Sequence, residues 1–237
     1  MTEEAASHGT ALGEDDLRLR RRHAASGVVA LGTFLALHLL VQATALGGSG
    51  RWEHLAGALA RSTPVSMAIV LLVLFPLAFH FLLGLALVRR PLAAEDVAHY
   101  GSARRARAQR WGGLALLVFV VVHAWALAGP RAFLGLSAAG SHTLLEAHLS
   151  STWAGLPLVA LGTILGVALA CFYVVNGAHA ASRIFALESG ARARTLATAV
   201  GAVLFVVGTA TVIGVATGAG AVPEPTLPTA ACGPAAP

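Results

Sequence analysis

The sequence contains no lysine, so all sixteen of its basic residues are arginine. Only 11% of the 237 residues are charged, whereas a soluble domain carries about a quarter. This low charge excludes an ordinary soluble enzyme. The two cysteines, Cys171 in an apolar stretch and Cys232 near the end, are too few for a disulfide framework or a four-cysteine metal site. Glycine patterns that bind nucleotides are absent as well.

Apolar residues make up 57% of the chain and are concentrated in five long runs. A helix needs about 20 apolar residues to cross a bilayer, and each run has this length. The runs are 24–46, 65–88, 111–129, 154–182 and 195–222. The sequence therefore predicts an all-α integral membrane protein with five transmembrane helices.

The chain divides into three parts on the same grounds. Residues 23–222 form the transmembrane domain, and residues 1–22 precede it as a polar segment. Residues 223–237 are rich in proline and alanine and are predicted to be disordered. The gap at 130–153 is expected to include an amphipathic turn around Leu144, Leu145 and Leu149.

The arginines predict how the chain is oriented, because cytoplasmic loops carry the excess of basic residues. Three arginines, at positions 51, 61 and 131, fall in the first and third gaps. The other thirteen share the opposite side: Arg18, Arg20, Arg21, Arg22, Arg89, Arg90, Arg104, Arg105, Arg107, Arg110, Arg183, Arg192 and Arg194. We therefore expect a cytoplasmic N-terminus and an extracytoplasmic C-terminus.

A cleaved signal peptide is the alternative interpretation of the first run, and Ala43-Thr44-Ala45 resembles a cleavage site. The run is about 23 residues long, however, and a signal core has about 7–15. The four later spans also alternate correctly only if the first is retained.

Four of the ten histidines lie inside the predicted spans, one on each of the first four: His38, His80, His123 and His179. An ionisable side chain at that depth is costly and normally faces the interior of the bundle. Separate interhelical hydrogen bonds would explain any single one. The other six fall in tails, loops or interfaces: His8, His23, His54, His99, His142 and His148.

Counting from the arginines at 1.5 Å per residue gives each histidine a depth. His38 lies about 24 Å and His123 about 20 Å from the arginine-rich end, whereas His80 lies about 14 Å from it. His38 and His123 can therefore meet at one level. His80 needs a partner at another level.

Two neutral imidazoles from facing helices in an apolar bundle are the ligands that haem iron takes above and below its ring. Arginines at helix ends could pair with the haem propionates. A bis-histidine iron has no open position, so such a site carries electrons. Zinc is disfavoured because it normally takes four ligands at one level.

The sequence leaves two candidates for the partner of His80. His179 lies only about 6 Å from the arginine-rich end, whereas Tyr173 lies about 15 Å in and matches the depth of His80. Gly84 follows His80 by four residues and Gly177 follows Tyr173 by four, which would let a flat ring approach the backbone. Arg183 follows His179 at the same spacing and would suit a propionate.

This pattern resembles the five-helix, dihaem cytochrome b membrane anchor of succinate:quinone oxidoreductase, that is, of succinate dehydrogenase or fumarate reductase. The similarity covers residues 21–215. It rests on Ser26-Gly27 before His38-Leu39-Leu40, Pro76-Leu77-Ala78-Phe79-His80 with Gly84, Gln109-Arg110-Trp111 before His123, and Phe172-Tyr173 with Asn176-Gly177.

The resemblance implies a haem-binding bundle formed by the first four helices and two haems b. His38 and His123 would bind the distal haem, and His80 would bind the proximal haem with a ligand from the fourth helix. The family's fourth-helix ligand stands four residues before the glycine, where this chain has Tyr173. His179 is slightly preferred because imidazole is the usual axial ligand, but binding through Tyr173 or loss of the proximal haem stays open.

The resemblance also implies partners and a location. A flavoprotein and an iron-sulfur subunit would dock on the cytoplasmic face of a bacterial inner membrane, and electrons would exchange with a bound membrane quinone. The dicarboxylate site would lie on another subunit, and no nucleic acid partner is expected. Candidate proton carriers near the outer surface are Glu53, His54, Glu146 and His148.

Two other functions are compatible with the same residues. One is the cytochrome b subunit of a formate dehydrogenase or a hydrogenase. The other is a cofactor-free membrane scaffold whose histidines form hydrogen bonds between helices.

Overall fold

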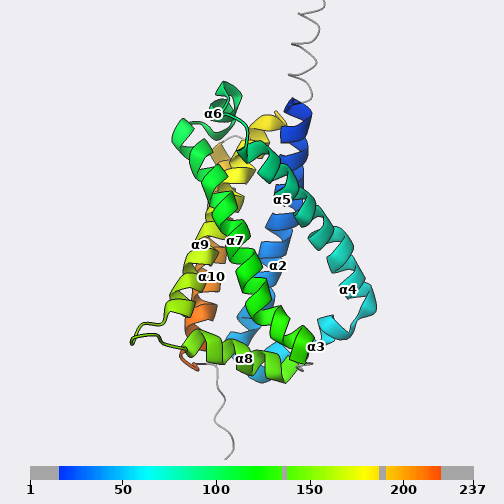
Figure 1. Cartoon of the computed structure of the whole chain (residues 1–237), viewed down its shortest axis with the longest axis vertical. Helices are drawn as coiled ribbons and strands as arrows, with labels where there is room; N and C mark the ends of the chain where they lie inside the picture. Colours follow the sequence, from blue (N-terminus) through cyan, green and yellow to red (C-terminus); the bar gives the residue numbers. More distant parts are fainter. Residues whose placement is uncertain (1–15, 135–137, 187–190, 220–237) are drawn as a thin grey trace, which may run out of the picture.

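The computed structural model describes residues 16–134, 138–186 and 191–219, and all regular elements within them are helical. Five segments are long and apolar enough to cross a bilayer, which confirms the five predicted spans (Figure 1). They are Asp16–Gly47, Thr63–Val88, Ala103–Leu127, Leu158–Ile184 and Arg194–Ala216. The predicted disordered tail, 223–237, and most of the segment 1–22 lie outside the described residues.

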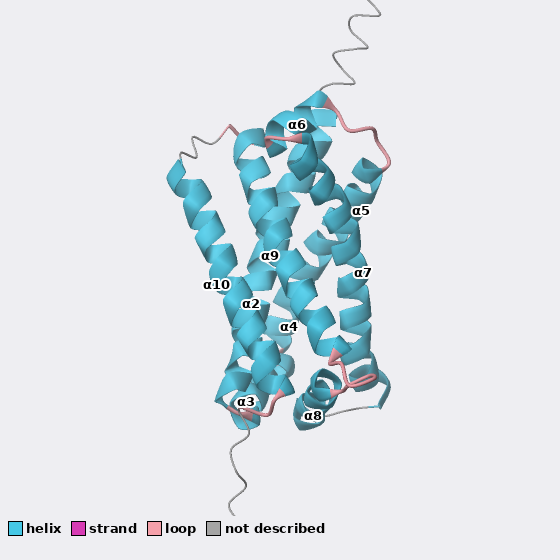
Figure 2. Cartoon of the chain, turned by 90° about the vertical axis from the view of Figure 1, so that its left-hand side faces the viewer, coloured by secondary structure: helices cyan, strands magenta, loops and turns pink. Residues whose placement is uncertain are grey.

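Several spans are built from more than one helical element, and three short helices lie between spans. The elements in order are η1 (Gly27–Leu31), α2 (Gly32–Ala43), η2 (Thr44–Gly47), α3 (Ser49–Arg61), α4 (Thr63–Ile69), η3 (Val70–Leu74), α5 (Phe75–Val88), α6 (Ala94–Tyr100), α7 (Ala103–Leu134), α8 (Ala138–Ser150), α9 (Leu158–Ile184) and α10 (Ala191–Ala216). Residues 16–26 are also helical and lead into η1. Figure 2 shows the spans along the long axis, with α6 at one end and α3 and α8 at the other.

The first span is already helical at Asp16, the first described residue, well before residue 24, where the apolar run begins. The side chain of Arg20 is buried there, because its Nε donates to the Asp16 carboxylate at 2.7 Å and its guanidinium also pairs with Asp96 of α6. Hydropathy marks only the apolar part of a helix. The polar turns that precede it are also helical, and within them Asp16 and Arg20 are paired.

Helix α9 lies at the centre of the bundle and contacts α7, α10, α6 and the first span. Small residues bring these helices close together, as is typical in membranes. A Cβ atom at Gly208 of α10 would lie 2.8 Å from Val167 and 3.1 Å from Leu39. The core between these helices consists of Leu31, Leu35, Leu39, Leu77, Leu116, Val167, Ala170, Cys171 and Tyr173.

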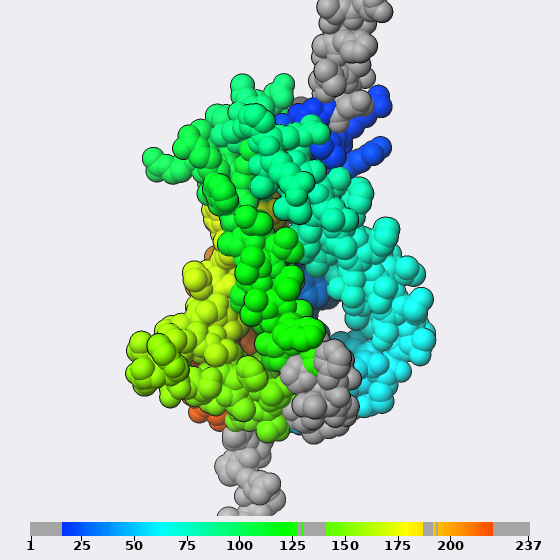
Figure 3. All heavy atoms as spheres, viewed as in Figure 1, coloured from blue at the N-terminus to red at the C-terminus, as the bar shows by residue number. Residues whose placement is uncertain are grey.

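The second span buries residues against the bundle only in its α5 half, although η3 also contacts η1 and α4 contacts α3. No residue of α4 or η3 is buried. Leu72 of η3 is 70% exposed, and Phe75 at the start of α5 is 71% exposed. Pro76 lacks an N–H and displaces the carbonyl four residues earlier, which explains the π-helical η3 just before it. In the space-filling view an opening separates this half of the span from α7 (Figure 3).

The end of the molecule opposite α6 is covered by two surface helices. The gap in which we predicted an amphipathic turn holds the helix α8. Leu149 of α8 is buried against Trp52 of α3, and Trp52 Nε1 donates to Gln42 Oε1 at 3.0 Å. These contacts hold α3 and α8 against the first span.

Asp96 organises the arginine-rich end, where α6 meets the first and third spans. Its side chain is 10% exposed, pairs with Arg20, and accepts a hydrogen bond from Arg110 at 3.0 Å. It also accepts from the Ala93 backbone amide at 3.0 Å. Removing one partner from a buried ion pair leaves a buried charge unpaired, which is strongly destabilising.

We therefore expect Asp96→Ala to lower the free energy of unfolding by about 3 kcal/mol. The neighbouring Glu95 is exposed, so Glu95→Ala is the matched control and should leave stability unchanged. Thermal unfolding of the detergent-solubilised chain measures both. Equal midpoints for the two variants would show that the Asp96 network does not stabilise the bundle.

Candidate functional site

The structure places His80 in a buried cluster with Tyr173 and His23, which we call the inner cluster. His80 is 3% exposed, and its Nε2 lies 3.1 Å from the Tyr173 hydroxyl. Its Nδ1 lies 3.0 Å from the His23 carbonyl, which can only accept, so Nδ1 carries the proton. Nε2 therefore accepts from Tyr173, and both ring nitrogens of His80 have partners.

His23 joins this cluster by stacking on His80, with ring centres 4.0 Å apart and planes 8° from parallel. Its Nδ1 is buried and has no hydrogen-bond partner among the described residues. Because His23 comes just before the first apolar run, hydropathy places it at an interface. The earlier start of the helix, at Asp16, carries it into the bundle.

Glycines let the three rings approach the backbone of neighbouring helices. A Cβ atom at Gly27 would lie 2.4 Å from the His80 ring, and one at Gly113 would lie 2.8 Å from the Tyr173 ring. Gly84, which we expected beneath a flat cofactor ring, faces the imidazole of His23 at 3.0 Å. The rings of the cluster therefore fill the space that these glycines leave.

A second polar pair connects α7 and α9 next to the inner cluster. Asn176 Nδ2 donates to Gln109 Oε1 at 2.8 Å, and Gln109 Nε2 donates to the Tyr173 carbonyl at 3.2 Å. Gln109 Nε2 also lies 3.3 Å from the Cβ position of Gly177. The family resemblance rests in part on Gln109-Arg110-Trp111 and Asn176-Gly177. It did not predict a hydrogen bond between these two segments.

A cavity of about 90 Å³ extends from the inner cluster toward the arginine-rich end, where Arg20, Asp96 and Arg110 line it. Arg183, the predicted propionate partner, donates instead to the carbonyls of Ala98 and His99 at 3.1 and 3.0 Å. Burial, with help from nearby Arg20 and Arg183, lowers the pKa of His99 below its usual value.

His179 lies away from the inner cluster. Its Nε2 is 3.3 Å from the carbonyl of Arg194, so the imidazole faces α10. The structure thus brings Tyr173 to His80 and does not bring His179 there. The depth count, which matched Tyr173 to His80, agrees with this arrangement.

The structure brings His38 of α2 and His123 of α7 together in the other half of the bundle, and we call them the outer pair. Their ring centres are 6.2 Å apart and their planes are 84° from parallel. Phe34 stacks on His38 at 5.2 Å, and Phe119 stacks on His123 at 5.3 Å. Neither imidazole of the pair forms a hydrogen bond within the described part of the chain.

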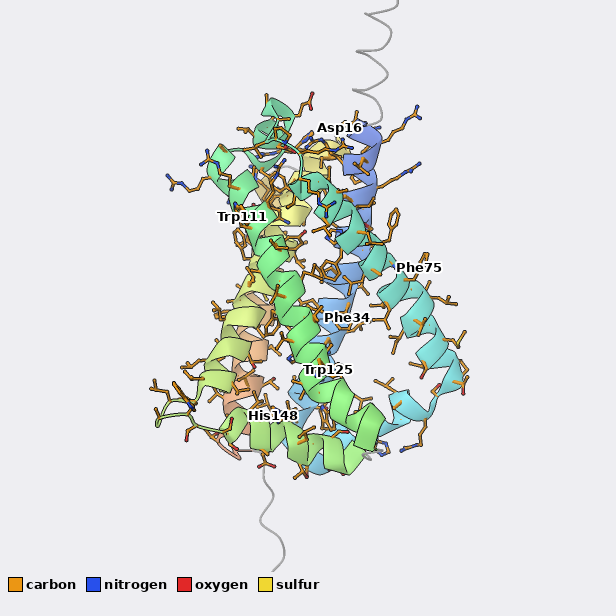
Figure 4. All side chains as sticks on the ribbon, in the orientation of Figure 1. Asp16, Phe34, Phe75, Trp111, Trp125 and His148 are labelled. Atoms are coloured by element: carbon orange, nitrogen blue, oxygen red, sulfur yellow. The ribbon has the colours of Figure 1, made fainter. Side chains whose placement is uncertain are left out.

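Open apolar space lies beside His123 of the outer pair. His123 lines a cavity of about 280 Å³ between α7, α8 and α9. Figure 4 places Phe34 of α2 and Trp125 of α7 near the opening beside the second span, and Trp125 is 68% exposed. The two histidine levels therefore differ in hydrogen bonding, since both ring nitrogens of His80 have partners.

The candidate proton carriers lie on the surface helices. Glu53 and His54 are on α3. Glu146 is on α8 with a carboxylate oxygen 4.0 Å from His142 Nδ1, and His148 Nδ1 lies 3.1 Å from the Leu144 carbonyl. These groups are not assembled into a single cluster.

No protein-family model, curated protein or solved structure matches this chain. Its fold defines a multi-pass, all-helical membrane protein with five spans. Within this class, the feature that distinguishes the chain is histidine at two depths of the bundle.

Because His80 is held by hydrogen bonds at both nitrogens, it cannot easily move away from a new side chain at Gly27. Gly27→Ala should therefore overpack the inner cluster and lower the free energy of unfolding by about 1–3 kcal/mol. Gly32→Ala is the control, because its Cβ would be in ordinary contact with Val174 at 3.7 Å.

Alanine also favours a helix over glycine by about 1 kcal/mol, so Gly32→Ala should keep or raise the thermal midpoint. Unfolding both variants in one detergent gives the comparison. If Gly27→Ala is as stable as Gly32→Ala, His80 is not rigidly held against the first span.

Proposed function

We propose that the chain is the haem b membrane anchor of a succinate:quinone oxidoreductase, which passes electrons between an iron-sulfur subunit and membrane quinone. The outer pair carries the proposal. His38 and His123 come from different spans, meet at one depth, and have no other polar partner among the described residues.

The spacing of the outer pair fits two axial ligands of one metal. A ring centre lies about 1 Å from its nitrogens and a metal–imidazole bond is about 2 Å, so imidazoles on opposite sides of one ion have centres about 6 Å apart. The observed distance is 6.2 Å. The stacked rings of Phe34 and Phe119 restrict how either imidazole can rotate.

The surroundings of the outer pair suit a large apolar macrocycle. The opening between α7 and the second span is bordered by a span half that buries none of its apolar side chains (Figure 3). When bound there, haem iron would accept and release one electron at a time. The chain's own residues would supply the ligands, orient them and exclude water.

The arginine-rich end supports docking of the iron-sulfur and flavoprotein subunits. It carries many exposed guanidinium groups, which attract an acidic surface. The exposed arginines there are Arg18, Arg21, Arg22, Arg89, Arg90, Arg104, Arg105, Arg107, Arg192 and Arg194. By the positive-inside rule this end is cytoplasmic, and we propose that the chain lies in a bacterial inner membrane in that orientation.

The purified full-length chain should show the Soret and α bands of a b-type cytochrome on reduction. His38→Ala and His123→Ala should each lose these bands at least tenfold, because either change removes an axial ligand. His54→Ala is the control, since His54 is an exposed residue of the surface helix α3, and it should keep the full spectrum.

A chain that folds without a Soret band would contradict the haem assignment and support a cofactor-free scaffold. The oxidoreductase type is tested separately, by purification with its natural partners. Copurification of a flavoprotein and reduction of the haem by succinate are expected. Reduction by formate or hydrogen, and not by succinate, would assign the chain to another membrane oxidoreductase.

A further inference from the structure

We propose that the chain binds haem at the outer pair only, and that the inner cluster is a haem-free set of contacts connecting the first, second and fourth spans. The inference rests on the proposed function, and it departs from the two haems that the family resemblance implies. Three observations on the inner cluster support it.

The first observation is the distance between His80 and Tyr173. Two atoms that bind one metal ion from opposite sides are about 4 Å apart, because each bond is about 2 Å. His80 Nε2 and the Tyr173 hydroxyl are 3.1 Å apart, which is the length of a hydrogen bond and leaves no room for an ion between them. Nδ1 of His80 is occupied by the His23 carbonyl.

The second observation is the position of the other imidazoles. The lone pair of a ring nitrogen lies in the ring plane, so two imidazoles across a metal ion point their edges at each other. His23 instead presents its face to His80, with planes 8° from parallel. His179 faces α10 through the Arg194 carbonyl. Neither histidine is placed to be the second ligand opposite His80.

The third observation is space. Side chains already lie against Gly27, Gly84 and Gly113, the glycines that border the inner cluster. The cavity that remains at this level is about 90 Å³, and these side chains occupy the positions where a flat macrocycle would lie against the glycines. The cavity beside His123 is about 280 Å³.

The inner cluster has a different role in this arrangement. His80 on α5 bonds to the backbone of the first span and to Tyr173 on α9, and the Gln109–Asn176 pair adds α7. Hydrogen bonds between polar side chains connect helices where water is absent. His80 is therefore a positioning residue of the bundle.

Pyridine haemochrome analysis of the full-length chain, with protein determined by amino-acid analysis, tests the inference. We expect one haem per chain. Tyr173→Phe and His179→Ala should keep that haem and its spectrum, and His80→Ala should keep it while lowering the thermal midpoint. His38→Ala should contain none.

Two haems per chain, falling to one in His80→Ala, would overturn the inference and leave the proposed function intact. One haem that is lost in Tyr173→Phe and retained in His38→Ala would overturn it too, because the haem would then be at the inner level. Absence of haem from the folded wild-type chain would instead overturn the proposed function. The wild-type count and Tyr173→Phe keep the test decisive if His80→Ala does not fold.

Discussion

An imidazole inside a membrane must find a polar partner, because hydrocarbon offers none and an unsatisfied polar group there is costly. This constraint organises both halves of the bundle. A hydrogen bond, a metal ion or a route to water can stabilise a buried ring nitrogen. Nδ1 of His23 has no hydrogen-bond partner among the described residues, whereas both ring nitrogens of His80 have one.

The two histidine levels meet the constraint in different ways. At the inner cluster a tyrosine hydroxyl and a backbone carbonyl satisfy His80, and glycines let the rings pack against neighbouring helices. At the outer pair His38 and His123 have aromatic neighbours but no polar ones among the described residues. A shared metal ion would satisfy both, which is why the proposed haem belongs at that level.

Much of this arrangement follows from the sequence because helical rise is uniform. Counting residues from the arginines placed His38 level with His123, and Tyr173 level with His80, and the structure brings both pairs together. The five spans follow from hydropathy alone. Whether a segment is a membrane-spanning helix, and how deep a residue lies in it, depend on the order of residues along the chain. A sequence pattern can therefore predict both.

The other features of the bundle depend on how the helices pack against one another, which a sequence pattern does not predict. Apolar residues cover every face of the second span, so hydropathy cannot distinguish its packed half from the half that leaves the opening in Figure 3. Hydropathy places His23 at an interface because it comes just before the apolar run. The helix extends beyond that run, where Arg20 pairs with Asp16, and His23 stacks on His80 inside the bundle. The rotation of His179 toward α10 likewise depends on where the fifth span packs.

Electron paramagnetic resonance of the oxidised full-length chain tests the central claim most directly, because it reports the axial ligands of ferric haem. Two imidazoles with planes 84° apart predict a single low-spin signal with the strong anisotropy of perpendicular ligand planes. A high-spin signal, a second low-spin signal, or no ferric haem signal would contradict a single haem held between His38 and His123.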